Sequence, residues 1–199
     1  MFIVFEGGDG SGQDTQADLL QDYLIDLGYK VWRTREPTKG EIGLRIKRIL
    51  QGKEPKLGAF ELQELMSKDR EEHVKDIEKS LKNGEIVISS RYFYSTLVYG
   101  MADGVKYKKL WDLNKNFLRP DMVFYLDLDP ALAIERIEKR GQPKELFERQ
   151  EFLRKTRQGF LSLKNKFPEF KVIDGSGTIE HVHNLITAEV RKHLEEVTV

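Results

Sequence analysis

Phe2-Ile-Val-Phe-Glu-Gly-Gly-Asp-Gly-Ser-Gly-Gln-Asp-Thr-Gln16 is the stretch that decides the fold. It begins with an apolar run typical of a strand buried on both faces of a parallel sheet. Glycines at positions 7, 8, 10 and 12 then allow the backbone to turn its N–H groups inward as a nest for anions. Apolar residues recur at helical spacing over about 13–28, so the positive end of a helix faces the same nest. Strand, loop and helix together predict a phosphate-binding site.

The two residues after the last glycine depart from the usual phosphate-binding loop. The spacing Gly7-x4-Gly12 fits the P-loop pattern, which next requires Lys and then Ser or Thr. Gln13 and Asp14 occupy those places, so the loop itself supplies no positive side chain. A carboxylate at 14 would repel phosphate unless a cation lay between them, and carboxylates are ordinary ligands of Mg²⁺. The loop therefore predicts Mg²⁺ beside Asp14, and a glycine-rich turn that binds nothing is the alternative.

Composition limits the class of protein. The 199 residues suit one domain over 1–199, and 33 basic residues balance 33 acidic ones. Because the charges balance, we expect no nucleic-acid partner. The chain has no Cys, which excludes a disulfide framework and thiol chemistry and fits a cytoplasmic location. No apolar run is long enough for a signal peptide or a membrane span, so we expect no membrane association.

Strand and helix patterns alternate along the chain. We expect strands over 2–5, 30–34, 86–89, 122–127 and 171–173. Helical patterns run over about 13–28, 41–51, 59–83, 93–116, 130–140, 147–166 and 178–195. Strands separated by helices predict an α/β fold with a five-stranded parallel sheet flanked by helices. Ligands of such sheets bind beyond the carboxyl ends of the strands. The polar stretch 139–144 predicts a mobile lid between two helices.

Three arginines stand out near the expected binding edge. Arg35 and Arg91 each follow a strand directly, where an Arg can grip a phosphate through its bidentate fork. Arg70 lies on the long helix predicted over 59–83. Taken singly, each would be a surface residue by default. Two of them at strand ends beside a phosphate loop indicate a binding function.

Other candidate metal ligands are weak. His181 and His183 are two residues apart on a predicted helix, so they point to different sides and favour a solvated surface over a zinc site. Asp127 and Asp129 end the fourth predicted strand. They either approach Mg²⁺ or cap the helix that begins near Pro130.

These segments, in this order, resemble thymidylate kinases over nearly the whole chain. The stretch from Phe5 to Gln16 is similar to the family's P-loop, and Thr34-Arg35-Glu36-Pro37 is similar to its Arg-Glu-Pro segment. Arg91-Tyr92, with Ser95 and Tyr99 after it, resembles the family's Asp-Arg-Tyr/His motif and the following helix. Further matches are Arg70 with His73, Arg119-Pro120-Asp121, Leu126-Asp127, Arg136 with Arg140-Gly141, Phe147-Glu148, and Asp174-Gly175-Ser176 with Glu180.

The resemblance implies a three-layer P-loop NTPase fold with a short lid at about 139–149. It implies an enzyme that transfers the γ-phosphate of ATP to dTMP to give dTDP, with Mg²⁺ as cofactor. It also implies a homodimer built from helices, for which the helix over 59–83 is the candidate interface. Gly10 stands where one branch of the family has an Arg, so the chain resembles the branch that places its basic groups in the lid.

The resemblance also carries site residues over to this chain. Those it gives to the acceptor nucleotide are Asp9, Arg35, Glu36, Met66, Arg70, Arg91 and Tyr99, with Arg35 and Arg91 on its phosphate and Arg70 on the thymine carbonyl. Those it gives to the phosphates of ATP are Gly7, Gly8, Gly10, Ser11, Gly12, Gln13, Asp14 and Thr15. The adenine of ATP would be bordered by Arg136, Gly175 and Ser176. Catalytic roles fall to Asp9, Arg91, Arg140, Lys144 and Arg149, and the metal lies near Asp9 and Asp14.

The chain departs from the family pattern at five positions. They are Gln13 for Lys, Asp14 for Ser or Thr, Ser90 for the Asp before Arg91, Met66 for the Phe that stacks on thymine, and Leu146 for the lid Arg. The arginines for the acceptor phosphate are kept, whereas the donor side loses positive charge at Gln13 and Leu146. Two alternatives therefore stay open. One is a nucleotide-binding relative with weak or no activity, and the other is a kinase of another pyrimidine nucleotide or nucleoside.

Overall fold

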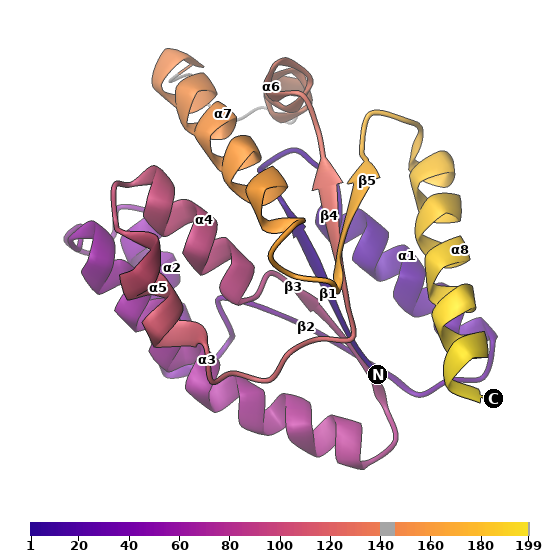
Figure 1. Ribbon diagram of the computed structural model, residues 1–199. Helices are drawn as coiled ribbons and strands as arrows, with labels where there is room; N and C mark the ends of the chain where they lie inside the picture. Colours follow the sequence, from indigo (N-terminus) through magenta and orange to yellow (C-terminus); the bar gives the residue numbers. More distant parts are fainter. Residues whose placement is uncertain (140–145, 199) are drawn as a thin grey trace.

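Five strands form one sheet in which every neighbouring pair is parallel (Figure 1). The structure is a computed structural model that describes residues 1–139 and 146–198, without the side chains of 146–149 and 197–198. The strands are β1 (Phe2–Gly7), β2 (Val31–Arg35), β3 (Ile86–Ser90), β4 (Met122–Asp127) and β5 (Phe170–Asp174), in the order β2-β3-β1-β4-β5. The predicted five-stranded parallel sheet is confirmed.

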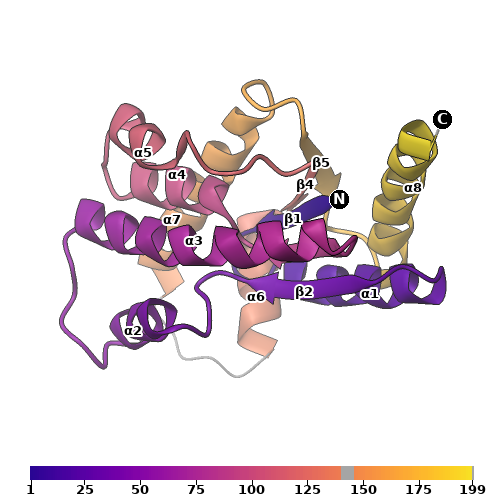
Figure 2. The same cartoon turned by 90° about the horizontal axis from the view of Figure 1, so that it is seen from below.

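Helices cover both faces of the sheet, which makes three layers (Figure 2). They are α1 (Gln13–Asp26), α2 (Glu41–Leu50), α3 (Ala59–Lys82), α4 (Phe93–Ala102), α5 (Tyr107–Asn114), α6 (Pro130–Lys139), α7 (Leu146–Leu163) and α8 (Ile179–Thr198). The side chains of Ile3 and Phe5 pack with α1 and α8, whereas Phe2 and Val4 pack with α3, α4 and α7. The whole of β1 is buried because it lies at the centre of the sheet and is covered on both sides.

The helix predicted over 93–116 is two helices, so that prediction is wrong. Gly104 adopts the left-handed conformation at φ 86°, and its N–H donates to the carbonyl of Met101 at 3.0 Å. This closes the end of α4, because a helix commonly stops where a glycine turns left-handed. The other helices and strands begin and end within a few residues of the predicted bounds.

The carboxyl ends of the strands meet at one edge of the sheet, and the segments predicted to bind ligands leave from that edge. β1 ends at Gly7, β2 at Arg35 and β3 at Ser90. The lid expected at 139–149 lies outside the described residues, apart from Lys139 and the backbone of 146–149. Within the described part of the chain, no helix combines the length and the apolar character needed to cross a membrane.

Candidate active site

The loop between β1 and α1 forms an open nest of backbone amides. Gly10 and Gly12 adopt the left-handed conformation at φ 83° and 87°, and the Ser11 N–H donates to the Gly8 carbonyl at 3.1 Å. A Cβ at position 10 would lie 2.7 Å from the carbonyl oxygen of Ala133, so only glycine fits there. No described side chain caps the amino end of α1, so its first amides stay available to a ligand.

A cavity of about 300 Å³ opens over this nest, and we call it the phosphate cavity. Every residue from 8 to 15 lines it, together with Arg35, Arg91 and Ile137. The Gln13 side chain is 6% exposed, and its Oε1 finds no hydrogen-bond partner in the described residues. Because Oε1 lies 3.5 Å from where a Cβ of Gly7 would be, the amide folds back toward the end of β1. An uncharged amide thus stands where P-loops carry a lysine.

Asp14 and Ser90 contact each other directly beside the phosphate cavity. The Ser90 hydroxyl donates to Asp14 Oδ1 at 2.5 Å. Arg33 donates through Nη2 to the Ser90 hydroxyl at 2.6 Å and to Asp14 Oδ1 at 3.3 Å. Arg35 Nη2 lies 3.6 Å from the other carboxylate oxygen. Burial alone would raise the pKa of Asp14, but the Ser90 hydrogen bond and the charges of Arg35 and Arg33 hold it below its ordinary value.

Asp14 and Ser90 each carry the chemical group that the expected pattern places at the other position. The hydroxyl that the P-loop pattern requires at position 14 is found at Ser90, and the carboxylate expected before Arg91 is found at Asp14. A hydroxyl–carboxylate hydrogen bond joins the two positions. The two departures from the expected pattern are therefore in direct contact, and the carboxylate gains from the positive amino end of α1.

Arg91 is held in a strained backbone conformation after β3. Its φ of 67° is the one positive value outside glycine among the residues described. Its guanidinium donates to the Tyr99 hydroxyl at 2.9 Å, the Ser95 hydroxyl at 3.4 Å and Asp9 Oδ1 at 3.2 Å. Its backbone N–H donates to the Phe5 carbonyl at 2.8 Å, so both the backbone and the side chain are fixed.

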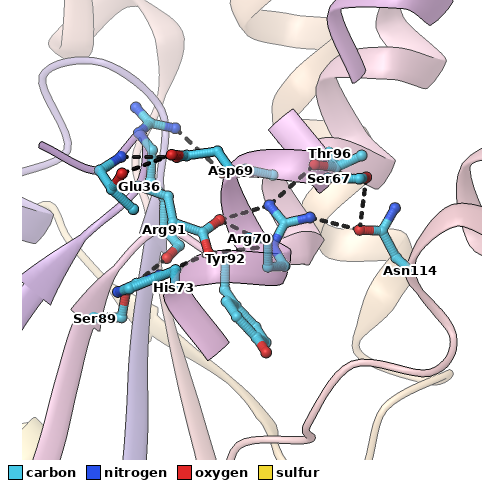
Figure 3. A network of polar contacts seen from close by, with 12 residues as sticks. Glu36, Ser67, Asp69, Arg70, His73, Ser89, Arg91, Tyr92, Thr96 and Asn114 are labelled. Atoms are coloured by element: carbon cyan, nitrogen blue, oxygen red, sulfur yellow. Dashed lines mark hydrogen bonds and ion pairs between the residues drawn. The ribbon is translucent and has the colours of Figure 1, made fainter. Parts of the chain in front are cut away.

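Arg70 lies at the centre of a buried polar network (Figure 3). Its Nε and Nη2 donate to the carboxylate of Glu36 at 2.6 to 3.2 Å. Nη1 donates to Asn114 at 2.5 Å, and Nη2 donates to the Thr96 hydroxyl at 3.2 Å. His73 Nδ1 lies 3.0 Å from the same carboxylate. Burial would raise the pKa of Glu36, but Arg70 and His73 together hold it below its ordinary value.

A second cavity, of about 400 Å³, is lined mainly by α3 and α4, and we call it the acceptor cavity. All the residues predicted for the acceptor nucleotide line it except Arg35, which lines the phosphate cavity instead. Gln63, Leu62, Ser95, Thr96 and Phe152 complete much of its wall. Asp9 and Arg91 line both cavities, so the two spaces meet at these side chains.

A third cavity, of about 300 Å³, shares Gly10 and Gly12 with the phosphate cavity and is also lined by Arg136 and Gly175. Ser176 is absent from its described lining, and its N–H donates to the Asp174 carboxylate at 2.9 Å. Two of the three residues predicted to border the adenine, Arg136 and Gly175, therefore lie together at the third cavity.

Three predicted catalytic residues lie outside the described part of the chain, namely Arg140, Lys144 and the side chain of Arg149.

The remaining aspartates have other partners. Arg157 donates through Nε and Nη2 to the two oxygens of Asp127 at 2.8 and 2.9 Å. Asp129 accepts the N–H of Ala131 at 2.9 Å, which confirms the capping alternative for Asp129. In the described ranges no three His, Asp or Glu side chains gather as a metal site.

Two site residues were not singled out by sequence analysis. Arg33 lies two residues before Arg35 on β2, and alternation along a strand places both on one face. That signal was available in the sequence. Gln63 carried no such signal, because a glutamine on a helix is expected to face solvent.

A parallel sheet, a glycine loop leading into a helix, and two cavities that meet at the loop define a P-loop nucleotide kinase. A family profile described as thymidylate kinase matches residues 5–186. A probable thymidylate kinase of Thermococcus kodakarensis is 41% identical over 98% of this chain and 100% of its own length. One from Pyrococcus horikoshii is 40% identical over 97% of each chain, and a thymidylate kinase of Caldicellulosiruptor saccharolyticus is 36% identical over 98% and 96%. The chain belongs to the thymidylate kinase family.

Glu6 generates a prediction about stability and pH. This fully buried carboxyl accepts the N–H groups of Tyr92 and Ser95, and desolvation raises its pKa to about 7. The folded state therefore binds the proton more tightly than the unfolded state. The stabilisation is complete below about pH 4.5 and is lost as the pH rises to about 7. Between pH 5 and pH 8, Glu6→Gln should lose about 2 kcal/mol less unfolding free energy than the wild type.

Denaturant titrations at several pH values measure this difference, with the exposed Glu180→Gln as the matched control. The same pH profile in wild type and Glu6→Gln would contradict a buried neutral carboxyl.

The contact between Asp14 and Ser90 generates a second prediction. Asp14→Ser removes one of the two carboxylates that Arg33 contacts and leaves it only Asp18, and Ser90→Asp sets two carboxylates side by side. Each single variant should be destabilised by about 1 kcal/mol or more, whereas the double variant restores the pair in the other order. We expect the double variant to be more stable than the sum of the singles by about 1 kcal/mol or more. Unfolding free energies of the four proteins measure this coupling, and simple additivity would show that the pair is not a unit.

Proposed function

We propose that this chain transfers the γ-phosphate of ATP to dTMP and releases dTDP and ADP. The observation that carries this proposal is the meeting of the two cavities at Asp9 and Arg91. A donor phosphate in the phosphate cavity would face an acceptor phosphate in the acceptor cavity. Membership of the thymidylate kinase family and relatives of that name over the full chain support dTMP as the acceptor.

The acceptor phosphate is proposed to bind Arg35 and Arg91. Both guanidinium groups line the phosphate cavity, and Arg91 also reaches the acceptor cavity. Phosphoryl transfer requires mainly positioning and charge neutralisation. An acceptor phosphate oxygen attacks the γ-phosphorus while the bond to the β–γ bridging oxygen breaks, and the electron pair leaves with ADP. Asp9, paired with Arg91 at 3.2 Å, keeps that guanidinium directed to the junction.

The donor phosphates are proposed to bind the amides of the glycine loop and the first turn of α1. Asp14 would hold Mg²⁺, because its Oδ1 is bonded to Ser90 while Oδ2 makes only a long contact with Arg35. The carboxylate is about half exposed at the cavity, which fits a cation that shares its ligands with phosphate. The ion supplies neutralisation of phosphate charge when bound. Asp9 is a second carboxylate of the same cavity.

The lid and the assembly complete the proposal. Arg140, Lys144 and Arg149 are proposed to supply the positive charge that Gln13 lacks. The chain is proposed to act as one domain over 1–199, as a cytoplasmic homodimer that associates through α3. The adenine would lie in the third cavity beside Arg136 and Gly175.

A nucleotide-binding relative with weak activity is the second candidate function. The uncharged Gln13 favours it, because lysine at that position neutralises the phosphates where charge develops. Turnover of ATP with a panel of monophosphates and nucleosides separates the candidates. Turnover with dTMP above all other acceptors supports the kinase. Tight binding of dTMP without turnover would support the second candidate.

The two acceptor arginines generate a binding prediction. Arg35→Ala and Arg91→Ala should each weaken dTMP binding by about 1.5–3 kcal/mol, because each removes charge-assisted hydrogen bonds. Arg91→Lys should recover only part of the loss, since lysine keeps the charge without the bidentate geometry. Calorimetry measures the affinities, and Arg191→Ala on α8 is the control. Unchanged dTMP affinity in both alanine variants would remove the assignment.

The proposed magnesium site predicts that one substitution, Asp14→Ala, affects ATP affinity differently in the presence and absence of Mg²⁺. With Mg²⁺, Asp14→Ala should weaken ATP binding about tenfold, because the carboxylate that holds the ion is lost. With a chelator, the same change should leave ATP affinity equal or improve it, because a charge that repels phosphate is removed. Calorimetry under both conditions measures this, and Asp26→Ala at the far end of α1 is the control. Equal weakening under both conditions would contradict the metal bridge.

A further inference from the structure

Gln63 is a buried amide that faces the acceptor cavity without a protein partner. It lies on α3, is 3% exposed and lines the cavity. None of the described residues donates a hydrogen bond to its side chain or accepts one from it. Glu36 and Thr96 of the same wall are both bonded to Arg70, whereas the buried Tyr92 hydroxyl, like Gln63, has no partner in the described residues. Neither polar atom of the amide is among the fully buried unsatisfied atoms, so the amide is open to the cavity, where a ligand can supply its hydrogen bonds.

The surroundings of Gln63 are arranged to make room for it. A Cβ at position 100 would lie 2.6 Å from Leu110 Cδ2 and 3.2 Å from Gln63 Cγ, so glycine there leaves space for the glutamine stem. Met66 and Arg70 follow Gln63 on the same side of α3 and line the same cavity. The Gln63 amide therefore shares one wall of the cavity with the apolar side chain of Met66 and the guanidinium of Arg70.

We propose that Gln63 is a specificity-determining residue that binds the edge of the pyrimidine base. This inference rests on the proposed function. Thymine presents a ring N–H beside a carbonyl, and a primary amide is complementary to that pair. The Gln63 carbonyl oxygen accepts the N3–H of the base, and its NH₂ group donates to the O4 carbonyl. The ligand class is a 2,4-dioxopyrimidine monophosphate.

The proposal explains how a cavity with few free polar groups could select one base. A site built to pair a ligand's polar edge rejects a ligand with the wrong edge, because its own buried groups are then left unpaired. 5-Methyl-dCMP is the matched probe, since it keeps the methyl group of dTMP and changes only the donors and acceptors at positions 3 and 4.

Calorimetry on the full chain tests the inference with dTMP and 5-methyl-dCMP. Gln63→Met keeps the length of the side chain and removes both hydrogen bonds, so dTMP affinity should fall about tenfold and the preference for dTMP should shrink. Gln63→Glu offers acceptors only, so it should lower dTMP affinity further and shift the ratio toward 5-methyl-dCMP, which carries an amino donor. Gln158→Met on the exposed side of α7 is the matched control.

Each outcome decides the inference. Unchanged dTMP affinity and an unchanged ratio in a folded Gln63→Met protein overturn it and leave the proposed function intact. Wild-type protein that binds neither nucleotide overturns the proposed function and the inference with it. If Gln63→Met does not fold, judged by its thermal unfolding, the Gln63→Glu ratio decides. A ratio equal to that of wild type then overturns the role of Gln63.

Discussion

The buried ion pair between Glu36 and Arg70 is the constraint on which the rest of the site depends. Two charges removed from water are costly unless their hydrogen bonds are satisfied. Here the guanidinium is also bonded to Asn114 and Thr96, so the pair joins the end of β2 to α3, α4 and α5. Since Arg35 directly precedes Glu36, anchoring the carboxylate also sets where Arg35 leaves the sheet at the edge of the phosphate cavity.

Electrostatic balance at the glycine loop follows from the same edge of the sheet. Arg33 and Arg35 point from β2 toward Asp14, and Arg91 leaves β3 toward Asp9. The Ser90 hydrogen bond and these arginines hold the pKa of Asp14 below its ordinary value although the carboxylate is partly buried. A loop without lysine therefore still has positive charge close to it, contributed by neighbouring strands and spread over several guanidinium groups rather than concentrated at one ammonium.

Local patterns predicted the fold well, and pairings between distant residues could not be predicted. Apolar runs were sufficient to predict the strands, and the spacing of the glycines was sufficient to predict the phosphate loop. The break at Gly104 was missed because apolar helical spacing continues beyond it, through Leu110. The direct contact of Asp14 with Ser90 spans 76 residues and exists only because β1 and β3 are neighbours in the sheet. Apolar spacing predicted α3, but its buried side carries Gln63, Ser67, Asp69, Arg70 and His73 as well as Ile77.

The arrangement along α3 has a consequence for how such an enzyme can change. Gln63, Met66 and Arg70 stand on one face of a single helix, whereas the residues proposed for the phosphates lie at strand ends and in the glycine loop. In the proposed function, the base and the phosphates are therefore bound by different elements, which are linked through the contact of Arg70 with Glu36. A relative could come to bind another base by exchanging side chains on this one face of α3. The segment from Gln63 to Arg70 is about 10 Å long. Changes at Gln63 and Met66 would leave the residues proposed for the phosphates untouched, whereas a change at Arg70 would break the ion pair that fixes the end of β2.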